Sequence, residues 1–171
     1  MRRAIISEGV RRSTCCCFAG LEKTRLRRPI DDIKVDLENE ILSTIRKGYT
    51  TFITALAYET DIWAGNIVLR LRKDRFPELK LIVAIPFPEY DECHYCLSNE
   101  WTNEWTIEKY DILRIQADGV WEAAPSRNEE AYQVRNEWMI DRCSRIIAIF
   151  DGKYSKLLQY AANLDKVFVE A

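Results

Sequence analysis

The chain has 171 residues, with 25 Lys or Arg against 27 Asp or Glu, so its formal net charge is -2. This length is typical of one domain, and the near-balance of charge excludes a global attraction to nucleic acid or anionic lipid. No run of about 18 apolar residues occurs, which excludes a membrane-spanning helix, and the apolar stretch near the start is too short for a signal peptide. We therefore expect a cytoplasmic protein with no membrane or nucleic-acid partner.

The sequence predicts two parts of unequal size. Residues 1–12 include four arginines and are expected to form a flexible basic segment, whereas residues 13–171 form a single domain.

Three of the six cysteines, Cys15, Cys16 and Cys17, are adjacent and lie in an apolar run. Because a chain with 47% hydrophobic residues can build a core without cross-links, reduced and buried thiols are predicted.

Six short apolar runs predict β-strands. They cover residues 13–19, 50–55, 79–85, 119–123, 145–150 and 166–169. Five longer segments between them have the apolar spacing of amphipathic helices. These segments are residues 33–47, 61–73, 103–116, 128–143 and 155–163. The predicted helix caps are Asp31 or Asp32, Thr60 and Ser126, and Gly48 is the predicted end of the first helix.

Alternating strands and helices indicate an α/β fold with a parallel sheet. We expect a three-layer α/β/α Rossmann-like domain with strand order 3-2-1-4-5, the sixth strand being an optional addition at the edge. Ligands in such sheets bind beyond the carboxyl ends of the strands, where the strand order reverses. This order brings four loops to that point, residues 19–30, 56–60, 124–127 and 151–154.

The loop after the first strand is the first candidate anion site. Gly20 is followed by Lys23, Arg25, Arg27 and Arg28. Guanidinium groups bind phosphate oxygens in bidentate geometry, so this cluster can hold a phosphate. A solvated surface loop explains the same residues equally well.

Further candidates lie in the other loops and on the fourth helix. Asp61 starts the second helix, where it either caps that helix, the favoured interpretation, or binds a ribose hydroxyl while the helix amides face a phosphate. Asp151 and Gly152 form a turn directly after the fifth strand. Arg135 and Asn136 lie beside the expected crevice, where either a ligand or neighbouring loops can engage them.

Motifs for metal binding and catalysis are weak. Cys93 and Cys96 flank His94, the single histidine, in a spacing that can bind zinc or form a redox pair, but the second half of a zinc site is missing. We therefore expect no metal site and no cofactor. The chain has no glycine-rich phosphate loop and no nucleophile elbow. Most of the five tryptophans are expected to pack in the core.

The sequence resembles the YpsA-like proteins of the SLOG superfamily, Rossmann-like domains that bind nucleotide-derived ligands. The matching segments are GYTTFI at 48–53, DIWA at 61–64, AIPF at 84–87, RNEWMID at 135–141, DG at 151–152 and YA at 160–161. Their order and spacing agree with the predicted strands and helices. The resemblance implies the same fold and a nucleotide-derived small molecule as partner.

The departures from the family fall in the loops that would hold the ligand. Where the family has Thr-Gly-His-Arg-Pro, this chain has AGLEK at 19–23, and Gly-Met-Ala-Arg-Gly-x-Asp is replaced by ALAYETD at 55–61. The Gly-Gly-Thr segment expected after Gly152 is absent. Because glycine permits close approach to phosphate and Glu22 and Glu59 repel it, we expect weaker binding or a different ligand.

These observations favour a non-catalytic or regulatory protein related to domains that bind nucleotides or ADP-ribose-type ligands. The candidate ligand-binding residues are Gly20, Arg25, Glu59, Asp61, Arg135, Asn136, Asp151 and Gly152. One alternative is an enzyme that hydrolyses the N-glycosidic bond of a nucleotide, with a carboxylate from Glu59 or Asp61. Another is an interaction scaffold without a small ligand, with an apolar patch near Trp101 and Trp105. A homo-oligomer or a protein partner is left open.

Overall fold

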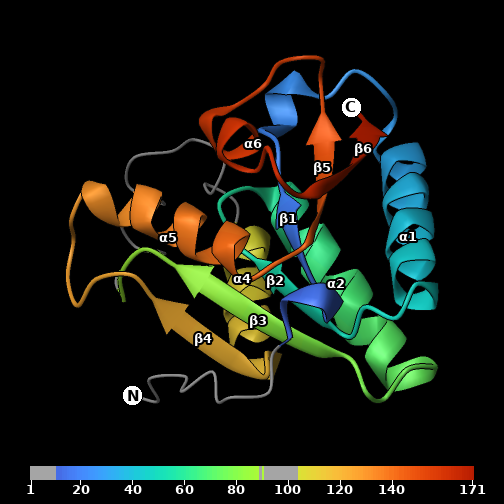
Figure 1. Ribbon diagram of the computed structural model, residues 1–171, viewed down its shortest axis with the longest axis horizontal. Coiled ribbons are helices and arrows are strands. Elements are labelled where there is room, and N and C mark those ends of the chain that lie inside the picture. The colour runs from blue at the N-terminus through green and yellow to red at the C-terminus, as the bar shows by residue number, and fades with distance from the viewer. Residues whose placement is uncertain (1–10, 89, 91–103) are drawn as a thin grey trace.

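The computed structural model describes residues 11–88, 90 and 104–171. Six parallel strands form one sheet in the order β4-β3-β2-β1-β5-β6 (Figure 1). The strands are β1 (Cys15–Ala19), β2 (Thr51–Thr54), β3 (Lys80–Ile85), β4 (Gly119–Glu122), β5 (Arg145–Phe150) and β6 (Asp165–Glu170). Since all neighbouring strands are parallel, their carboxyl ends lie along one edge of the sheet.

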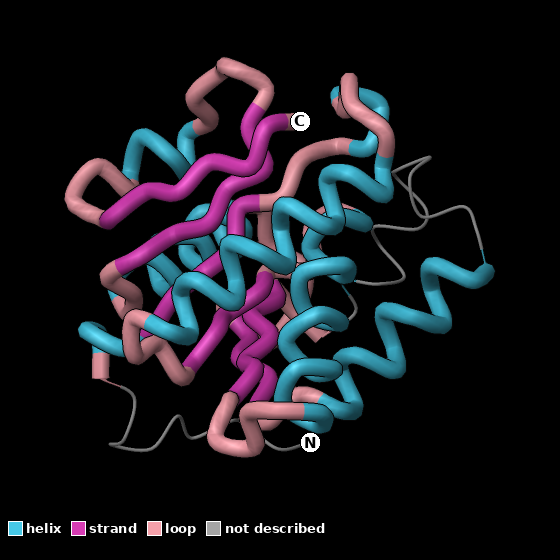
Figure 2. Tube along the Cα trace, turned by 90° about the vertical axis from the view of Figure 1, so that its right-hand side faces the viewer, coloured by secondary structure: helices cyan, strands magenta, loops and turns pink. Residues whose placement is uncertain are grey.

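Helices cover both faces of the sheet, so the domain has three layers. One face carries α1 (Ile30–Arg46), α2 (Glu59–Asp74) and α4 (Glu104–Gln116), which lie side by side in Figure 2. The other face carries α5 (Glu130–Asp141) and the short α6 (Lys156–Tyr160). Two 3-10 turns, η1 (Arg12–Thr14) and η2 (Lys23–Arg25), flank β1. The predicted α/β/α Rossmann-like architecture is confirmed.

The core forms two layers because successive residues of a strand point to opposite faces. In β1, Cys16 and Phe18 pack toward α1 and α2, whereas Cys15 and Cys17 pack toward α5. All four side chains are buried. The apolar run predicted as a strand at 13–19 is therefore a buried central strand, as its composition predicts.

The position of one strand differs from the expected order. The strand at 119–123 was expected beside the first strand, but β4 lies at the outer edge, paired with β3, and β5 pairs with β1. The physical reason is burial: β5 is almost fully buried, whereas every residue of β4 is only partly buried, as suits an edge strand. The order therefore reverses between β1 and β5, and the loop at 124–127 does not lie at that point.

The first helix begins earlier than its sequence pattern predicts. It starts at Ile30 after Pro29, so Asp31 and Asp32 lie in the first turn and do not cap it. Acidic groups there still interact favourably with the helix dipole. The predicted end at Gly48 is confirmed, and its φ of +97° is a conformation that favours glycine.

Two other predicted caps are wrong. Thr60 lies inside α2, and its hydroxyl accepts a hydrogen bond from the Leu21 amide at 2.9 Å. This bond ties α2 to the loop after β1. Ser126 does not cap α5, because the side chain of Asn128 accepts the hydrogen bond from the Glu130 amide at 2.9 Å.

Candidate functional site

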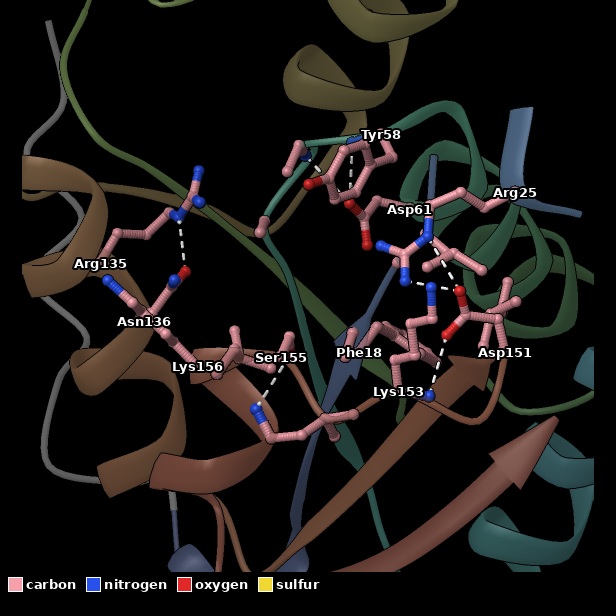
Figure 3. A pocket seen from close by; sticks show the side chains of 18 residues that line it. Phe18, Arg25, Tyr58, Asp61, Arg135, Asn136, Asp151, Lys153, Ser155 and Lys156 are labelled. Carbon is pink, nitrogen blue, oxygen red and sulfur yellow. Dashed lines mark hydrogen bonds and ion pairs between the residues drawn. The ribbon is translucent and has the colours of Figure 1, made fainter. Parts of the chain in front are cut away.

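A cavity of about 230 Å³ opens at the carboxyl edge of the sheet, at the point where the strand order reverses (Figure 3). Its walls come from the loop after β1, the loop between β2 and α2, the middle of α5 and the segment between β5 and α6. Phe18 and Ile149 contribute apolar surface. Three of the four loops predicted to meet at a crevice line this cavity, and the loop at 124–127 does not.

The cavity brings together most of the predicted site residues. Six of them line it: Gly20, Arg25, Asp61, Arg135, Asn136 and Asp151. Gly152 lines a neighbouring hollow. Glu59 lines neither cavity, because its carboxylate turns to Lys23, with Oε2 3.2 Å from Nζ.

Asp61 does not start α2, as the sequence pattern predicts, but is the third residue of this helix and caps it from within the first turn. Its side chain is buried, and Oδ2 accepts hydrogen bonds from the amides of Ala57 at 3.0 Å and Tyr58 at 2.9 Å. These amides precede α2, where an anion is favoured by the helix dipole. The chain therefore supplies its own anion at this helix end, which is the favoured of the two predicted roles.

Gly20 lies directly against this carboxylate. A methyl group on Gly20 would lie 2.6 Å from Oδ1 of Asp61, closer than atoms of side chains normally approach. Glycine at this position therefore allows the loop after β1 to pack on Asp61. The space beside the Gly20 backbone, where a phosphate was expected to approach, is occupied by the Asp61 carboxylate.

Arg25 and Asp151 form an ion pair across the cavity rim (Figure 3). Nε and Nη2 of Arg25 donate to the same oxygen of Asp151, Oδ2, at 2.9 and 2.5 Å. The Lys153 amide donates to the other oxygen at 3.1 Å, across a turn in which Gly152 has φ +94°. Two opposing effects act on the pKa of Asp151: partial desolvation favours a higher value, and the hydrogen bonds from Lys153 and Arg25 favour a lower one. The hydrogen bonds outweigh the desolvation, so the pKa of Asp151 lies below its ordinary value.

Arg135 reaches the cavity from α5 and is only 5% exposed. Its Nε donates to Oδ1 of Asn136 at 3.2 Å, and its guanidinium carbon lies 5.9 and 5.7 Å from the ring centres of Tyr90 and Tyr132. Nη1 is buried and has no hydrogen-bond partner within residues 11–88, 90 and 104–171. The Arg135 side chain also forms a hydrogen bond with Tyr90, so among the donors of Arg135 it is Nη1 that lacks a bond to the described residues. A buried donor without a bond is costly, which makes Nη1 a candidate contact for an anionic group.

The cavity carries an excess of positive charge. Four cationic side chains, from Arg25, Arg135, Lys153 and Lys156, face two carboxylates, from Asp61 and Asp151. Lys153 and Lys156 were not among the predicted site residues. Their signal was their position within six residues after β5, because residues that follow a parallel strand lie at the ligand-binding edge.

Other predicted features lie away from the cavity or outside the described residues. Cys93, His94, Cys96 and Trp101 are not described, and neither is the side chain of Trp105. The metal and redox interpretations of Cys93, His94 and Cys96 therefore stay predictions. The same holds for the scaffold alternative, which depends on Trp101 and Trp105. In the described part of the chain, no group of three or more His, Cys, Asp or Glu side chains could hold a metal ion.

The other cysteines and tryptophans of the described chain are structural. Cys15, Cys16, Cys17 and Cys143 are free and buried, which confirms reduced thiols at these positions. Three tryptophans pack within the fold: Trp63 is in the core, and Trp121 stacks on Trp138 with ring centres 4.2 Å apart. None of the three lines the cavity. Among the described helices, none is long and apolar enough to cross a membrane.

Comparison with known proteins assigns the family. The profile of the YpsA domain, described as the YspA SLOG family, matches residues 24–169. The chain belongs to this family. The resemblance inferred from the motifs at 48–53 and 135–141 is thereby confirmed, and the matched region includes most of the cavity wall.

Relatives of this YspA SLOG member are distant. A UPF0398 protein of Ligilactobacillus salivarius is 25% identical over 84% of this chain and 74% of its own length. A UPF0398 protein of Bacillus pumilus is 25% identical over 75% of this chain and 65% of its own length. The SPbeta prophage-derived protein YoqJ of Bacillus subtilis, named as uncharacterized, is 28% identical over 70% of this chain and 74% of its own length. The chain thus spans from just under two thirds to about three quarters of these relatives.

Proposed function

We propose that this chain is a non-catalytic or regulatory member of the YspA SLOG family that binds a nucleotide-derived, anionic small molecule. The ligand occupies the cavity between the ends of β1, β2 and β5. The observation that carries the proposal is Arg135, a buried cation with Nη1 unused among the described residues and with its side chain lining the cavity. The protein acts in the cytoplasm, without membrane or nucleic acid.

Binding relies on side chains and not on a glycine-rich cradle of amides. The amides before α2 already bind Asp61, and the space beside Gly20 is filled by the same carboxylate. Arg135, Lys153 and Lys156 are the cations that remain to receive an anion, since Arg25 is paired with Asp151. Guanidinium and ammonium groups in a partly enclosed cavity bind phosphate or carboxylate oxygens strongly.

The carboxylates of the site argue against the hydrolase alternative. Asp61 is engaged by two amides, Asp151 by Arg25, and Glu59 by Lys23 outside the cavity. A general acid or base must reach the substrate and exchange protons near neutral pH. Carboxylates held in this way serve as structural anions, so we assign no catalytic residue.

The proposal is tested by thermal denaturation and calorimetry with AMP, ADP, ADP-ribose and NAD. Ligand at about 100 times its Kd should stabilise the wild-type protein by about 2.7 kcal/mol. Arg135→Met should abolish this stabilisation, whereas Arg127→Met, a matched change at an exposed arginine outside the cavity, should retain it. An unchanged melting temperature of the wild-type protein in millimolar concentrations of all four ligands would overturn the proposal.

A further inference from the structure

A second, larger cavity adjoins the first. Its volume is about 530 Å³, and it lies between η2 and the carboxyl ends of β5 and β6. The two cavities share three lining residues, Arg25, Asp151 and Lys153. The Arg25–Asp151 ion pair therefore stands at the boundary between two adjoining hollows, and one ligand can contact both.

The second cavity has a different chemical character, because aromatic rings form part of its wall. Phe150 and Phe168 both line it, and their rings stack with centres 4.4 Å apart and planes inclined by 29°. Tyr154 meets both rings edge-on, at 5.3 and 6.1 Å. Among the described rings, Phe168 is thus stacked with Phe150 alone, and its side chain is 39% exposed.

The exposure of these rings follows from the short crossover between β5 and β6. Phe168 pairs in register with Ala148, and both lie on the sheet face that α6 covers. Helix α6 has only five residues, so it leaves Phe168 and Tyr154 accessible, the latter at 53%. An exposed aromatic cluster next to cations is a suitable surface for a planar aromatic ring that is attached to an anionic group.

The volumes of the two cavities also favour a ligand with an anionic part and a planar ring. Small-molecule sites usually measure about 300–1,000 Å³. The first cavity, at about 230 Å³, is below this range and suits a phosphorylated sugar, whereas the second, at about 530 Å³, has room for a nucleobase. A nucleotide that used only the first cavity would leave its base outside.

We propose that the ligand binds in two parts, with its anionic end at Arg135 in the first cavity and its nucleobase stacked on Phe168 in the second. The sugar passes the Arg25–Asp151 pair. This inference rests on the proposed function and deepens it, because it assigns a base-recognition site at the β5–β6 edge. The ligand class is a nucleoside phosphate or its ADP-ribose-type derivative, and a base-free sugar phosphate is a weaker ligand.

The test compares AMP and ADP-ribose with ribose 5-phosphate by isothermal calorimetry. Stacking of one base contributes about 1–3 kcal/mol, so Phe168→Ala should weaken both base-bearing ligands by about 5- to 150-fold and leave ribose 5-phosphate unchanged. Phe168→Leu, which keeps apolar bulk, should weaken them in the same selective way. Tyr160→Ala, a change at an exposed ring that lines neither cavity, should have no effect.

Each outcome decides one of the two claims. If the base-bearing ligands bind equally well to the wild-type protein and to both Phe168 variants, the base site is disproved while the proposed function survives. Equal loss for ribose 5-phosphate and AMP would also disprove base recognition by Phe168. If none of the ligands binds the wild-type protein, the proposed function itself fails, and the base site with it.

Discussion

Gly20 and Asp61 are in such close contact that a single added methyl group on Gly20 would lie 2.6 Å from Oδ1 and 2.7 Å from Cγ of the carboxylate. The carboxylate cannot move aside easily, because it is buried and Oδ2 accepts two amide hydrogen bonds. We expect Gly20→Ala to lower the free energy of unfolding by about 1–3 kcal/mol, the usual cost of overpacking. Urea denaturation followed by circular dichroism measures this change.

A double-mutant cycle isolates the cause. Asp61→Ala removes the atoms that the new methyl group would meet, so Gly20→Ala should cost much less in that background than in the wild-type protein. Asp61→Ala alone should cost about 0.5–2 kcal/mol through loss of the helix cap. An equal cost of Gly20→Ala in both backgrounds would show that the contact with Asp61 is not the reason.

The Arg25–Asp151 pair predicts a pH dependence of stability. The pKa of Asp151 in the folded protein lies below its ordinary value of 3.8, so the ionised carboxylate stabilises the fold above about pH 4, and this contribution is lost as the pH falls through the folded pKa. Asp151→Asn should therefore lower the melting temperature by a constant amount between about pH 5 and 7. The difference from the wild-type protein should shrink below about pH 4.

Thermal denaturation of both proteins across this pH range measures the effect. Asp74→Asn is a suitable control, because Asp74 is exposed and lines neither cavity. A melting-temperature difference that persists undiminished to about pH 3 would show that the charge of Asp151 does not stabilise the fold.

Replacing Arg135 should affect ligand binding without lowering the stability of the protein. Because Nη1 is buried without a partner among the described residues, Arg135→Met removes a costly buried charge, at the expense of the cation–π contact with Tyr132 and the hydrogen bond to Asn136. We expect the free energy of unfolding to stay the same or to rise by about 1 kcal/mol. Chemical denaturation in the absence of ligand measures this, and a large loss of stability would instead assign Arg135 a structural role.

The buried thiols predict low reactivity. Burial raises the pKa of Cys16, and neighbouring Cys17 and Cys15 raise it further. Burial and the hydrogen bond shared between the Cys143 and Cys15 thiols raise the pKa of Cys143. Since the thiolate is the reactive form, iodoacetamide at about pH 8 should leave Cys16 and Cys143 unmodified in the folded protein and modify both after unfolding. Peptide mass spectrometry detects the modification, and rapid labelling of either residue before unfolding would contradict their burial.

The elements of this fold were largely predictable, because each has a local signal. Apolar runs such as Cys15–Ala19 identify buried strands, and the spacing of Ile33, Leu37 and Ile41 identifies α1. The position of β4 was less predictable. The apolar run at 119–123 predicts a strand, but it does not indicate whether that strand pairs with β1 or with β3. In the structure β4 pairs with β3 and is only partly buried, which identifies it as the edge strand.

The candidate site was predictable to the extent that topology alone brings residues together. Parallel strands end at one edge, so the segments that follow β1, β2 and β5 and contain Gly20, Asp61 and Asp151 had to lie near one another. The sequence could not predict the partners of these residues. Arg25 is 126 positions from Asp151, and no local pattern distinguishes a guanidinium that awaits a phosphate from one that is paired with a carboxylate.

The sequence by itself determined the family, the alternation of strands and helices, and the edge of the sheet where a ligand belongs. These follow from hydrophobic period and chain connectivity, which are local properties. Only the tertiary structure decided that Asp61 fills the space beside Gly20, that Glu59 turns away to Lys23, and that Phe168 is exposed beside a second cavity. These contacts join segments far apart in the chain, and their geometry is set by how the packed layers meet.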